Sequence, residues 1–86
     1  MPRRAARIDA TAPALVKLAK QLGADYLPIN GTVDGVLRHR GVYRLIDWKS
    51  PGGTLTDAQA KLVARGWKID FISTEAQLRE LLQIEN

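Results

Sequence analysis

The stretch LIDWKSPGGTLTDAQ, which runs from Leu45 to Gln59, decides how this chain folds. It begins inside a run of β-branched and aromatic residues over 42–49 that is typical of a strand. A Pro-Gly-Gly break at 51–53 ends that strand. Thr56 and Gln59 then have the spacing of a capping box, which predicts that a helix starts there. A strand followed by a helix predicts a crossover to a second, parallel strand in the same sheet.

A helix is predicted upstream of this stretch, over 12–22. Thr11 is its expected N-cap, Pro13 suits its first turn, and Gly23 stands just past its expected end. Four apolar residues lie at helical spacing and predict one buried stripe: Leu15, Leu18, Ala19 and Leu22.

Two further strands are predicted between that helix and the opening stretch. A short strand over 25–29 contains Pro28, which cannot donate a ladder hydrogen bond and so predicts an edge position. A strand over 33–39 is weakened by Gly35, and a tight turn at Arg40-Gly41 joins it to the strand over 42–49 as a hairpin.

Downstream, the helix that starts at Thr56 is expected to stop at Gly66. A fourth strand is predicted over 67–72, and a second capping box at Thr74 and Gln77 opens a last helix. The predicted order is therefore α-β-β-β-α-β-α. This is an α/β fold with a mixed four-stranded sheet flanked by helices.

The bulk properties narrow the classes of protein that fit. Eighty-six residues make one small domain, which we expect over 9–86 behind a flexible basic arm over 1–8. The chain has no cysteine, which excludes disulfides and thiolate metal sites and suits a reducing cytoplasm. We expect no signal peptide and no membrane span. The net charge of +4 favours a polyanionic partner such as nucleic acid.

The opening stretch also carries the strongest chemical signal. Asp47 and Lys49 point to the same side of their strand, because strand side chains alternate. Asp34 lies on the antiparallel neighbour, so the two carboxylates are expected to converge near the open end of the hairpin. Two hard oxygen ligands, with the backbone carbonyl of Trp48 as a third, favour Mg²⁺ or Mn²⁺. Lys49 would then orient a water or stabilise charge on a phosphate.

Each of these residues also has a structural interpretation. Asp47 and Lys49 are also consistent with a solvated ion pair, Asp34 with a turn, and Gln59 with capping alone. His39 is expected to contact phosphate or to lie on the surface. Trp48 and Trp67 are expected in the core or an interface. Basic residues expected to contact the DNA backbone are Arg3, Arg4, Arg7, Arg38, Arg40 and Arg44.

Taken in order, several short motifs form a pattern that resembles a known family. They are DAT (9–11), GA (23–24), GTVDGV (31–36), DWK (47–49), PGG (51–53), LTDAQ (55–59) and STEAQ (73–77). This set is similar to the PD-(D/E)xK nucleases, which share a restriction-endonuclease-like core. It resembles most the small phage-borne virus-type replication-repair nuclease (VRR-NUC) domains, which are Holliday junction resolvase-like.

The resemblance implies roles for four residues. Asp34 and Asp47 would be metal ligands, Lys49 the catalytic lysine, and Gln59 an active-site residue on the helix that follows. The chain departs from the family in having Val33 where a proline is usual. It also has Asp47 where a glutamate is usual, and no acid on the predicted first helix.

The sequence therefore leads to two alternative functions. The first is a Mg²⁺- or Mn²⁺-dependent endonuclease of phage type, selective for Holliday junctions or other branched DNA, in a bacterial cytoplasm. Cutting two strands of a junction implies a homodimer, with an interface at Trp48 or at Val42–Tyr43. The second is a catalytically decayed fold that serves as a DNA-binding or protein-interaction module.

Overall fold

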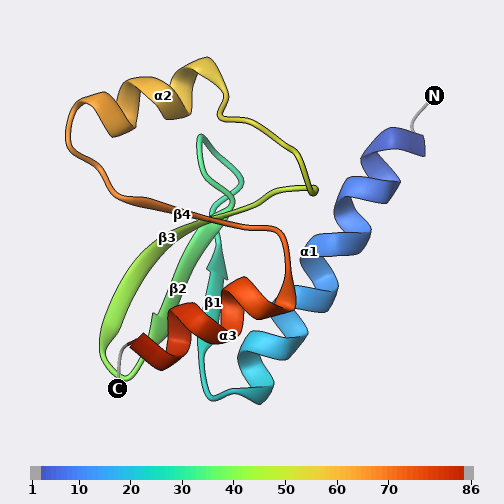
Figure 1. The fold of residues 1–86 in the computed structure, drawn as a ribbon, viewed down its shortest axis with the longest axis vertical. Coiled ribbons are helices and arrows are strands. Elements are labelled where there is room, and N and C mark those ends of the chain that lie inside the picture. Colours follow the sequence, from blue (N-terminus) through green and yellow to red (C-terminus); the bar gives the residue numbers. More distant parts are fainter. Residues whose placement is uncertain (1–2, 85–86) are drawn as a thin grey trace.

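The computed structural model describes residues 3–84, with side chains from Ala12 to Gln83. Seven elements follow in the predicted order (Figure 1). They are α1 (Arg3–Gln21), β1 (Asp25–Pro28), β2 (Gly35–His39), β3 (Val42–Trp48), α2 (Asp57–Ala64), β4 (Ile69–Ile72) and α3 (Glu75–Ile84). The predicted fold class is therefore confirmed.

The four strands form one mixed sheet in the order β1-β2-β3-β4. β1 pairs antiparallel with β2, and β2 with β3, whereas β3 and β4 run parallel. The parallel pair is joined through α2, as the strand-then-helix pattern predicts. Pro28 closes the edge strand, as expected of a residue that has no N–H for a central ladder.

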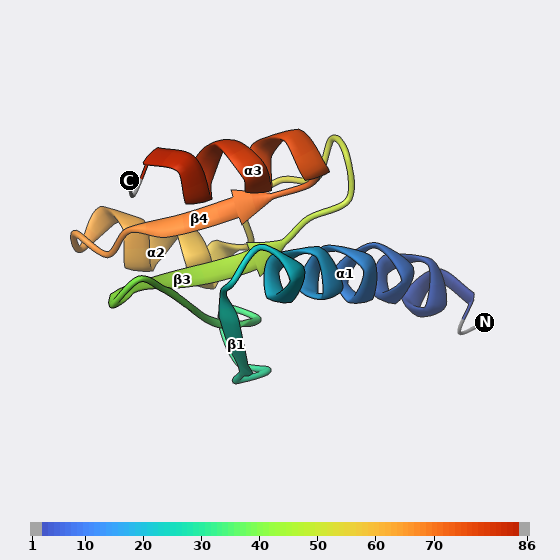
Figure 2. The same cartoon turned by 90° about the horizontal axis from the view of Figure 1, so that it is seen from below.

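The hydrophobic core lies on one face of the sheet, beneath α1 and α3. Figure 2 shows α3 lying along β4. Alternation along β2 and β3 turns Leu37 and Ile46 to this face, and both are fully buried. Further core residues come from both helices and the sheet: Leu15, Leu18, Ala19, Ala24, Trp48, Ile72, Leu78 and Leu82. α2 stands apart from α1 and α3 (Figure 1), and its Gln59 contacts Lys49. The opposite face of β3 is therefore the one that meets α2.

Two glycine-dependent features fix the sheet. Arg40 and Gly41 both have positive φ, 54° and 81°, which is the backbone of a type I′ hairpin turn. Gly35 allows β1 to close on β2, because a Cβ there would lie 2.4 Å from the Leu27 carbonyl oxygen and 2.5 Å from the Tyr26 hydroxyl. A glycine that weakens the strand pattern in the sequence is thus required by the packing.

The predicted caps of α2 and α3 are present. Thr56 caps α2 in a reciprocal capping box with Gln59. Gly66, with φ 100°, follows the helix end. Thr74 and Gln77 make the corresponding pair of hydrogen bonds at the start of α3. Local capping chemistry was therefore sufficient to place both helices.

The first helix is longer than the sequence predicts. α1 begins at Arg3, so residues 3–8 of the expected arm are helical, and Pro13 lies inside the helix instead of in its first turn. Residues 1 and 2 of that arm lie outside the described residues. Thr11 is not a cap, and Asp9 falls within α1 instead of before it. Alanine and arginine are strong helix formers, which accounts for the extension.

Two strands begin later than expected. β2 starts at Gly35, so Asp34 immediately precedes the strand, although its N–H still reaches the Ile46 carbonyl at 3.1 Å. β4 starts at Ile69 and leaves Trp67 in the preceding loop, 51% exposed and outside the core. The Trp67 N–H instead bonds to the Leu62 carbonyl and closes the end of α2.

Candidate active site

Asp34 and Asp47 converge at the end of β3, as predicted. The backbone N–H of Asp34 donates to Asp47 Oδ1 at 3.2 Å, and the N–H of Trp48 donates to Asp34 Oδ2 at 2.7 Å. Each carboxylate is thus held by the backbone of the segment that carries the other. Asp47 is only 6% exposed, so the simple surface ion pair is not what the structure shows.

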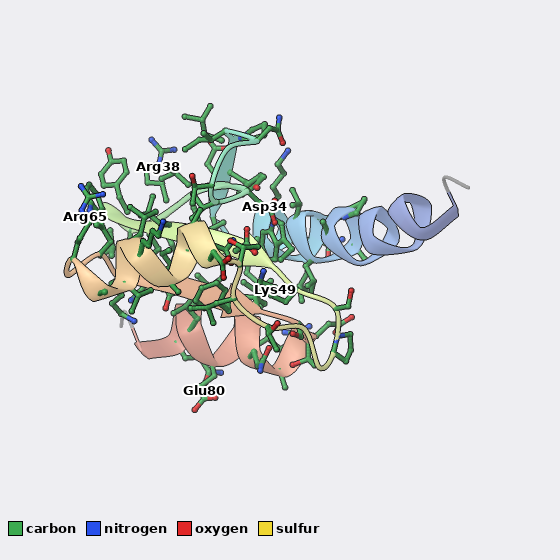
Figure 3. The ribbon with its side chains drawn as sticks, turned by 90° about the horizontal axis from the view of Figure 1, so that it is seen from above. Asp34, Arg38, Lys49, Arg65 and Glu80 are labelled. Carbon is green, nitrogen blue, oxygen red and sulfur yellow. The ribbon has the colours of Figure 1, made fainter. Side chains whose placement is uncertain are left out.

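Lys49 connects this carboxylate pair to α2. Its Nζ lies 3.0 Å from Asp47 Oδ2 and donates to Gln59 Oε1, also at 3.0 Å. Figure 3 shows Asp34 and Lys49 near one another, close to the first turn of α2. An ammonium has three N–H donors, and these two contacts use two of them. One donor therefore remains for a substrate oxygen.

Gln59 caps α2, as its spacing predicts, and it also contacts Lys49 of the candidate site. It is 3% exposed. Its Oε1 accepts from the N–H of Thr56 as well as from Lys49, and its Nε2 donates to the Thr32 carbonyl at 2.9 Å. One amide therefore caps α2, fixes the lysine and ties down the loop that leads to Asp34.

Burial is the largest cause of the raised pKa of Asp34. It raises the pKa of the carboxyl, and the nearby Asp47 carboxylate raises it further by charge repulsion and by a shared hydrogen bond. The Trp48 N–H and the Lys49 charge act in the opposite direction without cancelling the rise. The surroundings of Asp34 therefore disfavour the charged form of its carboxyl.

The donor atoms at this point suit a hard cation. The Trp48 N–H faces Asp34, and the carbonyl of a strand residue faces the same neighbour as its N–H, so the Trp48 carbonyl lies on that side too. Mg²⁺ commonly binds through one or two carboxylates together with substrate phosphate and water. Asp34, Asp47 and this carbonyl fit such a shared site. The described residues hold no group of three acidic, histidine or cysteine side chains that would bind a metal alone.

Tyr26 belongs to the same neighbourhood, and the sequence did not reveal it. Its ring lies 5.5 Å from that of Trp48, centroid to centroid. Burial raises the pKa of its hydroxyl above the ordinary value of 10.0, and the charges of Asp34 and Asp47 add to the rise. The available signal was Gly35, whose missing side chain leaves room for this hydroxyl.

The basic residues expected at DNA have different surroundings. Arg38 is exposed and pairs loosely with Asp25 at 3.7 Å, and Arg40 is exposed in the hairpin turn. Arg44 instead forms a largely buried ion pair with Asp70 at 3.5 Å, because alternation turns it to the helix-covered face. Arg44 is therefore removed from the expected DNA contacts. The side chains of three others, Arg3, Arg4 and Arg7, lie outside the described residues.

His39 is not a surface residue. Alternation turns it to the core face, where it is 7% exposed. It lines a small cavity at the hairpin end of the sheet together with Arg40 and Arg79. This end of the sheet is opposite to the one that carries Asp47.

Comparisons of the chain with models of known protein families, with curated proteins and with solved structures gave no match. From residue 3 to residue 84, the structure has no helix with both the length and the apolar character needed to cross a membrane.

Proposed function

We propose that the protein is a Mg²⁺- or Mn²⁺-dependent DNA endonuclease of the PD-(D/E)xK type. The observation that carries the proposal is the partly buried constellation of Asp34, Asp47, Lys49 and Gln59 at one end of the sheet. Two carboxylates meet there, burial raises the pKa of Asp34, and a lysine is fixed beside them by contacts at 3.0 Å. A partly buried acidic pair beside a positioned cation is typical of a catalytic site.

The chain's own groups have distinct parts in the proposed reaction. Asp34, Asp47 and the Trp48 carbonyl would hold the cation, which when bound supplies a water of lowered pKa and neutralises phosphate charge. Lys49 would direct its remaining N–H at a phosphate oxygen or at the attacking water. Gln59 would keep the Lys49 ammonium in place through its Oε1.

The substrate and assembly follow from the same proposal. The motif pattern favours branched DNA such as a four-way junction, cut in the cytoplasm of a phage's bacterial host. Cutting two strands requires two sites, hence a two-fold homodimer. Trp48 is buried and does not supply its interface, whereas Tyr43 is 71% and Val42 39% exposed.

The test is cleavage of end-labelled four-way junction, flap and plain duplex DNA in Mg²⁺ and in Mn²⁺. Asp47→Asn should lower the rate by about 100-fold or more, because it removes a negative charge that would hold the cation at the reacting phosphate. Asp57→Asn, at an exposed acid on α2, is the matched control and should cut as the parent does. Equal cutting by Asp47→Asn, or no cutting by the parent in either metal, would refute the proposal.

A second function is favoured by one observation: no third acidic ligand joins Asp34 and Asp47 among the described side chains. The fold would then serve as a DNA-binding module with a decayed site. In the same experiment, this alternative predicts junction binding without cutting, and binding that Asp47→Asn leaves intact.

A further inference from the structure

A groove leads away from the carboxylate pair on the side opposite to Lys49. α1 forms one wall through Pro13, Val16, Lys17 and Lys20, whose spacing places them on one stripe of the helix. The other wall belongs to β1, β3 and the loop before β2. Asp34 lies among the lining residues, so the groove and the candidate active site share this carboxylate. The groove has a volume of about 890 Å³.

The interior of the groove is apolar and aromatic. Tyr26 and Pro28 line it from the edge strand, and Trp48 forms part of its floor. Trp48 is 6% exposed, and its indole N–H has no hydrogen-bond partner among the side chains that the structure describes. The Trp48 indole lies near enough to the Tyr26 hydroxyl to affect the pKa of that hydroxyl. The two groups nevertheless do not meet the geometry of a hydrogen bond. The groove therefore combines flat apolar surface with an indole N–H that none of the described residues accepts.

The groove carries positive charge along α1 and negative charge at Asp34. Lys17 and Lys20 are exposed on α1. The acidic side chain in the described lining is Asp34, next to the proposed cation. A nucleotide would match this arrangement of charge if its phosphates lay toward the two lysines and its flat ring toward Tyr26. Sites that bind single-stranded nucleic acid combine a basic track with base stacking in the same way.

We propose that the groove binds an unpaired nucleotide next to the cleaved phosphate. In a duplex both faces of each base are stacked and its edge is paired, so only an unpaired base can enter. The volume lies within the roughly 300–1,000 Å³ of sites for groups of this size, which is too small for a double helix. This inference rests on the proposed function and, among branched DNAs, favours those with an unpaired nucleotide next to the cut, such as a flap or a junction whose branch point has opened.

The first experiment measures binding without cleavage, with Ca²⁺ replacing Mg²⁺ and fluorescein-labelled DNA followed by anisotropy. A duplex with a three-nucleotide gap is compared with a continuous duplex of the same length. The double variant Lys17→Glu/Lys20→Glu should weaken binding of gapped DNA by about ten-fold or more and abolish its preference over duplex. The control Lys61→Glu/Arg65→Glu makes the same charge change on two exposed residues, one in the last turn of α2 and one at its C-cap. It should affect both DNAs alike.

A second readout uses Trp48 itself. The chain has two tryptophans, so Trp67→Phe leaves Trp48 as the sole indole. Gapped DNA should change its emission, continuous duplex should not, and Lys17→Glu/Lys20→Glu should remove the response. Equal affinity for the two DNAs, or equal damage from the α1 and α2 charge reversals, would overturn the inference.

The two proposals fail in different ways. Tight, groove-dependent binding of gapped DNA without cleavage in Mg²⁺ or Mn²⁺ would reject the nuclease and retain the groove. Cleavage of continuous duplex at the rate of gapped DNA would reject the groove and retain the nuclease.

Discussion

The charge of Asp34 controls how the stability of the metal-free protein depends on pH. Because its pKa is raised in the folded state, mainly by burial, the fold binds this proton more tightly than the unfolded chain does. Its contribution is favourable below about pH 3.9, where an unfolded aspartate is also protonated, and is lost as pH rises through the folded pKa. Asp34→Asn should therefore raise the melting temperature at pH 7 and have little effect at pH 3.

Thermal unfolding between pH 3 and pH 8 without divalent metal measures this effect. Asp57→Asn is the control: it removes an acid from the first turn of α2, where negative charge is favourable, so it should destabilise slightly at pH 7. A melting temperature of Asp34→Asn below that of the parent at pH 7 would contradict the raised pKa.

Single residues also show where the sequence was informative. Asp34, Asp47 and Lys49 meet as expected because strand alternation and a short hairpin leave few other arrangements. Strand alternation turns Arg44 and His39 to the helix-covered face, although both were expected at exposed positions. Their charge and their neighbours in the sequence had suggested surface positions.

At the scale of elements, the start of α2 combines a cap with the candidate site. Thr56→Ala removes the cap hydrogen bond alone and should cost about 1 kcal/mol of stability without loss of cleavage. Gln59→Ala also leaves Lys49 and the Thr32 carbonyl without their partner. It should cost about 1–3 kcal/mol more and lower the cleavage rate.

Urea unfolding and junction cleavage of the two variants separate the roles of Gln59. A Gln59→Ala variant as stable and as active as Thr56→Ala would show that the residue is only a cap. A loss of cleavage beyond that of Thr56→Ala, at a temperature where both are folded, would show that the contact with Lys49 matters.

The elements themselves were predictable wherever capping or turn chemistry marks their ends. Both capping boxes and the Arg40-Gly41 turn were read correctly because each is a local motif. α1 was not, since Thr11 and Pro13 look like a start although they lie within a continuous helix. Trp67 looked like the first residue of β4, but its N–H closes α2 instead. A local sequence pattern does not show whether a residue at the boundary between two elements belongs to the first or to the second.

At the scale of the molecule, the sheet has one face that the described helices cover only in part. Register places Leu27, Val36 and Leu45 side by side on it, away from the core-facing Leu37. Leu27 is 64% exposed, and Tyr43 on the same face is 71% exposed. Helices α1 and α3 pack on the other face. An apolar surface next to the site is where the proposed homodimer would form.

Light scattering after gel filtration tests this assembly at micromolar concentration. We expect twice the chain mass of 9.5 kDa for the parent and the monomer mass for Leu27→Lys/Tyr43→Lys, since burying two new charges disfavours the interface. Gln83→Lys adds positive charge to exposed surface on α3 and should remain a dimer. A monomeric parent would exclude the dimer. A monomeric double variant that still nicks one strand of a junction, but no longer cuts both in one encounter, would tie the assembly to the two-strand reaction.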